Sequence, residues 1–112
     1  MKPETYEKWE NALSYFGNAE ELWKDGKPEE AARIADMAVW LACIAVTNLS
    51  DELKIDCLSE RAKHYITGWS NKIRKESYTA KQTIEEARGI LQLLSAELPA
   101  DTFRLFRTDT DS

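Results

Sequence analysis

The sequence predicts an all-α protein, an up-down bundle of three helices followed by a fourth, C-terminal helix. Apolar residues recur every three or four positions along almost the whole chain, which places them on one face of a helix. Helix-stopping and helix-starting residues divide this pattern into four long segments. The chain has 112 residues, enough for one hydrophobic core. We therefore predict one four-helix domain over residues 1–98 and a partly disordered tail over residues 99–112.

The first helix is predicted from about Glu4 to Lys24. Its apolar residues step by three or four and so predict one buried face: Tyr6, Trp9, Leu13, Phe16, Ala19 and Trp23. Gly26 suits the left-handed position that ends a helix. Pro28 suits the first turn of the next helix, where no amide hydrogen is needed.

The second helix is predicted from Pro28 to Asn48 and is the most informative segment. A row of alanines, here called the Ala seam, runs along it: Ala31, Ala35, Ala38, Ala42 and Ala45. Small side chains let neighbouring helices approach closely. Larger apolar side chains flank the seam: Ile34, Met37, Leu41 and Ile44 on one side, Val39 and Val46 on the other. Only Trp40 and Cys43 remain for the side of the helix opposite the seam. A helix that is apolar over most of its circumference is contacted by more than one neighbour, so we expect it to be the central helix.

Ser50, followed by two acidic residues, is expected to cap a third helix that reaches about Arg74. Gly68 within it costs roughly 1 kcal/mol relative to alanine, which indicates either tight packing or a tolerated weak point. The predicted buried arc comprises Ile55, Leu58, Ala62, Tyr65, Trp69 and Ile73, with Ile66 at its edge.

Thr79 with Gln82 has the pattern of a capping box for the fourth helix, and Pro99 ends it. Its apolar residues are Ala80, Ile84, Ala87, Leu91, Leu94 and Leu98. In the tail, Phe103, Leu105 and Phe106 are expected to dock on the bundle, because exposed aromatic side chains are unfavourable in water. The alternative is that they form a short recognition segment.

Composition disfavours several classes of function. The net charge is −5, from 20 acidic and 15 basic residues, without the dense basic face that nucleic-acid binding requires. The longest uncharged run, Met37 to Ser50, is shorter than a membrane-spanning helix, so no membrane insertion is expected. Two cysteines and an acidic N-terminal segment without a signal-peptide pattern favour a cytoplasmic location.

No catalytic, cofactor or metal site is expected. His64 shares a helical face with Asp56 and Glu60, but residues at that spacing commonly form a solvated face of paired charges. Cys43 and Cys57 have no second pair of cysteines with which to form a zinc site. As a nucleophile, either thiol would need a base to deprotonate it, and the chain has a single histidine. Both are therefore expected to be small buried side chains.

Residues 12–75 resemble a MIT domain, the three-helix module of ESCRT-associated ATPases. The resemblance begins at Ala19-Glu20-Glu21-Leu22, passes through Gly26-Lys27-Pro28-Glu29-Glu30-Ala31 and Ala38, and ends at Ala62-Lys63-His64-Tyr65-Ile66. The first half of this pattern also occurs in TPR hairpins.

The MIT resemblance implies a groove beside the third helix that binds a helix or tail of a partner. Ile66 matches an apolar contact residue of the family, whereas Ser70 stands where the family has an acid. Thr67-Gly68-Trp69 also departs from the family pattern, which puts recognition of the usual ESCRT tails in doubt. The predicted partner-binding residues are Ile66, Ser70, Ser59 and Ile73.

All four helices also resemble, more loosely, a HEPN domain, with Arg74 and Tyr78 preceding the closing helix. Many HEPN proteins are RNases that use an arginine followed four to six residues later by a histidine. His64 follows Arg61 by only three residues. The HEPN resemblance therefore implies a protein without nuclease activity.

The leading hypothesis is a non-enzymatic interaction module that binds a helix or tail of a protein partner beside the third helix. One alternative is a HEPN-like protein that lacks nuclease activity, of the kind associated with toxin–antitoxin or defence systems. Another is a homo-oligomeric assembly subunit that associates through the Ala seam or the fourth helix.

Overall fold

The computed structural model describes residues 3–54, 60, 63–64, 67–69 and 78–97. Its three complete helices are α1 (Pro3–Lys24), α2 (Pro28–Leu53) and α4 (Ala80–Glu97). Residues 60, 63–64 and 67–69 are helical as well. Every element in this described part is a helix, so the predicted all-α fold is confirmed.

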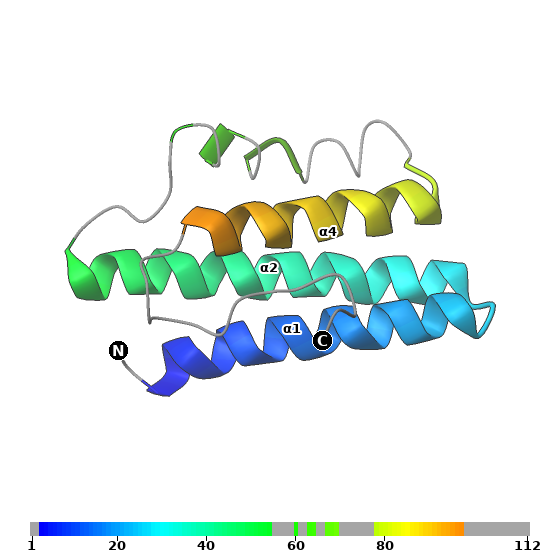
Figure 1. Ribbon diagram of the computed structural model, residues 1–112, viewed down its shortest axis with the longest axis horizontal. Coiled ribbons are helices and arrows are strands. Elements are labelled where there is room, and N and C mark those ends of the chain that lie inside the picture. The colour runs from blue at the N-terminus through cyan, green and yellow to red at the C-terminus, as the bar shows by residue number, and fades with distance from the viewer. Residues whose placement is uncertain (1–2, 55–59, 61–62, 65–66, 70–77, 98–112) are drawn as a thin grey trace.

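Helices α1 and α2 form an antiparallel hairpin, and α4 packs along α2 and runs in the same direction as α2 (Figure 1). Figure 1 shows α2 as the middle of the three. Its predicted central position is therefore confirmed. The complete four-helix bundle stays a prediction, because most of the third predicted helix lies outside the described residues, as do residues 98–112.

The turn between α1 and α2 follows the predicted chemistry. Gly26 has a φ of +79°, in the left-handed region where glycine has no steric penalty. Its N–H donates to the Trp23 carbonyl at 3.1 Å, and the Lys27 N–H donates to the Leu22 carbonyl at 2.9 Å. These two bonds form a Schellman motif, which satisfies the last carbonyls of α1 and reverses the chain.

The Ala seam is fully buried, as its spacing predicts: Ala31, Ala35, Ala38, Ala42 and Ala45 all have no exposed surface. Val39, Val46 and Leu49 extend the same buried side of α2. The seam is therefore the surface on which the neighbouring helices pack. Its alanines are covered within the chain, so they are not available for the self-association that the sequence suggested as an alternative.

The predicted end of the second helix is wrong. Helix α2 continues to Leu53, so Ser50 is an interior residue rather than the cap of a third helix. Lys54 closes α2 in a left-handed conformation, with a φ of 58°, and its N–H donates to the Ser50 carbonyl. Leu49, buried and four residues after Ala45, shows that the core-facing pattern carries the helix past the predicted stop.

The predicted buried face of α1 is partly wrong. Its buried residues are Thr5, Trp9, Ala12, Phe16 and Ala19, whereas Tyr6 is 46% exposed and Trp23 is 41% exposed. The true stripe alternates steps of four and three from Thr5 and leaves Leu13 only partly buried. The large aromatic residues Tyr6 and Trp23 fit the spacing of a buried face, but both lie at the exposed margin of the buried stripe.

Helix α4 begins with the predicted capping box. The Thr79 N–H donates to Gln82 Oε1 at 3.0 Å, and the Gln82 N–H donates to Thr79 Oγ1 at 3.1 Å. Of the predicted face, Ala80 is only partly buried and Leu98 lies outside the described residues. The buried residues of α4 are Thr83, Ile84, Ala87, Ile90, Leu91 and Leu94.

One described turn of the third predicted helix contacts α2. Trp69 is buried, as predicted, and its indole N–H donates to Asp36 Oδ1 at 2.8 Å. A Cβ built on Gly68 would meet no atom within 4 Å among the described residues, so the tight packing considered for Gly68 is not found. The buried indole and its hydrogen bond hold this turn against α2.

Candidate functional site

The four predicted partner-binding residues, Ile66, Ser70, Ser59 and Ile73, lie outside the described residues. The groove beside the third helix therefore stays a prediction. His64 is described and exposed, and Glu60 forms an ion pair with Lys63 at 3.7 Å. The other residues considered for metal, thiol and nuclease chemistry also lie outside the described residues: Asp56, Cys57, Arg61 and Arg74.

The described chain exposes a row of large apolar side chains on α2. Met37 is 42% exposed, Trp40 is 54% exposed and Ile44 is 36% exposed. Their spacing of three and four residues places them on one side of the helix, here called the outer face of α2. Successive helical residues turn by about 100°, so Trp40 points about 200° away from Ala38 of the buried seam. The outer face is thus turned away from the Ala seam, and Asp36, which accepts the Trp69 indole N–H, lies at its edge four residues before Trp40.

For two of these residues the prediction from the sequence is wrong. Met37 and Ile44 were expected to flank the Ala seam within the core, but both are exposed. The buried arc of α2 is centred on the small alanines, and α1 and α4 both pack against α2. Ile34 and Leu41, at the edge of the arc, are only partly buried.

Charged residues stand at both ends of the outer face. Arg33 is exposed four residues before Met37, and Asp51 is exposed seven residues after Ile44. Both fall on the same side of α2 as the apolar row, since steps of four and seven keep residues on one face. An apolar centre with a charged rim is the pattern of a protein-binding surface.

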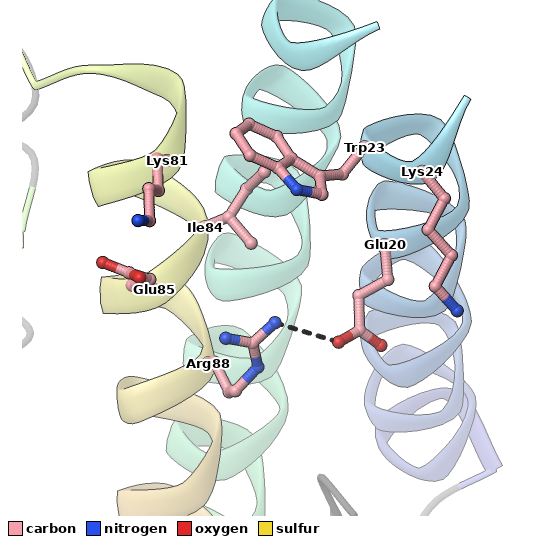
Figure 2. Close-up of a pocket in the computed structure, with 7 residues that line it drawn as sticks. All are labelled: Glu20, Trp23, Lys24, Lys81, Ile84, Glu85 and Arg88. Carbon is pink, nitrogen blue, oxygen red and sulfur yellow. Dashed lines mark hydrogen bonds and ion pairs between the residues drawn. The ribbon is translucent and has the colours of Figure 1, made fainter. Parts of the chain in front are cut away.

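A second feature is the α1–α4 hollow, an open depression where the end of α1 faces the start of α4 (Figure 2). It holds about 490 Å³ of empty space, including its open mouth. Figure 2 shows Arg88 of α4 reaching across α2 towards Glu20 of α1, and Ile84 lying near Trp23. The residues that line the hollow are Glu20, Trp23, Lys24, Lys81, Ile84, Glu85 and Arg88.

One pair of opposite charges links the two sides of the hollow. Arg88 Nη2 donates to Glu20 Oε2 at 3.0 Å, and the Arg88 guanidinium lies 5.6 Å from the centre of the Phe16 ring. Each partner of this ion pair keeps at least a third of its side chain exposed, so the pair itself adds at most about 1 kcal/mol. Its main effect is to fix the orientation of α4 relative to α1. The hollow is therefore better explained as a helix–helix junction than as a ligand site.

At the opposite end of the hairpin, Thr5 is buried and its hydroxyl donates to Glu52 Oε2. Sequence periodicity did not predict a buried threonine there. The signal that could have found it is the four-three spacing that links Thr5 to Trp9 and Ala12.

Cys43 is partly buried and packs against the core, as expected. Burial raises the pKa of its thiol from 9.0 to about 12, because the thiolate loses hydration. At neutral pH the side chain is therefore a neutral thiol, which is a poor nucleophile.

This pKa gives a testable expectation in a Cys57→Ala variant, where Cys43 is the only thiol. At pH 8, Cys43 should react with a chromogenic disulfide reagent at least a hundredfold more slowly in the folded than in the urea-unfolded chain. The raised pKa favours the folded state fully below pH 9, and this contribution is lost as pH rises towards 12. Equal reaction rates in folded and unfolded protein would show that Cys43 is accessible and reactive.

Within the described residues, no three His, Cys, Asp or Glu side chains gather as a metal site would require. Helix α2 is the one described helix long and apolar enough to cross a membrane. This finding rests on length and composition alone, and the core helix of a water-soluble protein meets the same criterion.

No protein-family model matches the chain, and neither a curated protein nor a solved structure matches it significantly. The MIT and HEPN resemblances accordingly stay predictions from the sequence.

Proposed function

We propose that this chain is a non-enzymatic helical interaction module that binds a helix of a protein partner on the outer face of α2. The observation that carries the proposal is the exposed row of Met37, Trp40 and Ile44. Three large apolar side chains at this spacing match the contacts that one amphipathic helix offers another.

The composition of the row favours protein binding. Tryptophan is the residue most enriched among those that dominate binding energy, and methionine adapts its shape to different partners. Trp40 lies between Met37 and Ile44 along the row, which suits a central anchor within a smaller apolar rim. The α1–α4 hollow offers a single exposed aromatic residue, Trp23, among charged side chains, and is the weaker candidate.

Site-specific photo-crosslinking in cells that naturally make the chain tests this proposal. A photoreactive phenylalanine analogue at position 40 should form a covalent adduct with a polypeptide. Position 23 is a matched control, because Trp23 is an exposed tryptophan of similar accessibility on α1. An adduct at position 40 with none at position 23 supports binding on the outer face. Adducts only at position 23, or none at either position, would refute the proposed site.

A further inference from the structure

The outer face of α2 is complementary to itself. When two α2 helices pack antiparallel and cross at the level of Ala42, positions equally far before and after Ala42 lie opposite each other. Trp40 then faces Ile44 of the second copy, and Ile44 faces Trp40 of the second copy. The largest side chain of each helix therefore meets a smaller, branched one, which favours interdigitation.

The charges at the ends follow the same symmetry. Arg33 and Asp51 are each nine residues from Ala42, and both are exposed on the outer side of α2. The antiparallel arrangement sets Arg33 opposite Asp51 of the second copy at both ends of the contact. Glu30 and Lys54 are also exposed, and each is twelve residues from Ala42. In the antiparallel arrangement Glu30 therefore lies at the same height as Lys54 of the second copy. A parallel arrangement would instead set Arg33 against Arg33, and like charges repel.

We infer that the partner bound by the outer face is a second copy of this chain, packed α2 against α2 in an antiparallel dimer. The inference rests on the proposed function and names its partner. Both subunits would use the same patch, as a twofold dimer requires. A single helix face covers less than the roughly 800 Å² per partner of a standard interface, so the dimer should be weak and dependent on concentration.

Sedimentation equilibrium of the purified full-length chain, from micromolar to near-millimolar concentration, measures this dimer. We expect a monomer–dimer equilibrium that Trp40→Glu weakens at least about tenfold, because it places a charge at the centre of the contact. Trp23→Glu, at the other exposed tryptophan, should leave the dissociation constant unchanged. Circular dichroism of each variant verifies that the helices are retained.

A charge exchange tests the geometry. Arg33→Asp and Asp51→Arg should each weaken the dimer several-fold, because each sets like charges opposite each other at both ends. The double variant should recover dimerisation. Glu7→Arg, a matched reversal at an exposed acid of α1, should have no effect. Failure of the double variant to recover dimerisation would overturn the antiparallel arrangement.

Other occupants of the outer face give different results. A monomer at all concentrations, with an adduct to another protein at position 40, would overturn the dimer but keep the proposed function. Cross-linking within one chain would assign the outer face to the tail, residues 99–112. A monomer that co-sediments with phosphatidylcholine–phosphatidylglycerol vesicles would assign the outer face to a membrane surface. Either result overturns both the dimer and the proposed function.

Discussion

Trp9→Ala should lower the free energy of unfolding by about 3–5 kcal/mol, whereas Trp40→Ala should change it by less than about 1 kcal/mol. Trp9 has no exposed surface and lies in the core with Phe16 and the Ala seam, so its removal leaves a cavity. Trp40 is more than half exposed. Domains of this size are stable by about 5–15 kcal/mol, so the loss at Trp9 is a large fraction of the total. Urea denaturation followed by circular dichroism measures both values.

Tyr6→Ala completes this comparison. The sequence pattern predicts Tyr6 and Trp9 on the same buried face, whereas in the structure only Trp9 is buried. Tyr6 is 46% exposed, so its truncation should cost much less than that of Trp9. Similar losses at Tyr6 and Trp9 would indicate that α1 presents the face expected from the sequence. Measurements at low protein concentration keep any effect of dimerisation out of the comparison.

The Ala seam could be predicted from the sequence because its signal is strong. Five alanines at steps of four and three have no other common explanation on an apolar helix, and all five are buried. The same holds for the Gly26 turn and the Thr79–Gln82 capping box, where a few residues within one turn determine the geometry. Such features depend on local contacts, so they can be predicted without knowledge of the rest of the fold.

The end of α2 could not be placed from local signals alone. Ser50 with Asp51 and Glu52 has the composition of a helix start, yet α2 passes through all three. Packing of Leu49 in the core and the bond between Thr5 and Glu52 both favour continued helix there. Thr5 lies on α1, 47 residues from Glu52 in the sequence, and tertiary contacts regularly override weak capping preferences.

The candidate site was the least predictable part. An apolar helix predicts that neighbours cover it, but the sequence does not state how many neighbours there are or on which side they pack. Met37 and Ile44 have the same chemistry as buried residues, yet α1 and α4 pack against other parts of α2 and leave both exposed. The pattern of exposed residues therefore had to come from the structure.

Ala38→Leu should destabilise the chain by about 1–3 kcal/mol, although it adds only apolar atoms to the core. Ala38 is the middle alanine of the seam and has no exposed surface, so a larger side chain must force its neighbours apart. Interior packing is too dense to absorb three additional carbon atoms without shifts of the backbone. Thermal and urea unfolding measure the loss.

Ala96→Leu is the matched control, the same substitution at an exposed position of α4. It should change stability by no more than about 0.5 kcal/mol, since leucine and alanine are both good helix formers. A stable Ala38→Leu variant would mean that the seam has room for a longer side chain and that the helices are not held at close range. The outer face would then lose its basis too, because that face is defined as the side opposite a closely packed seam.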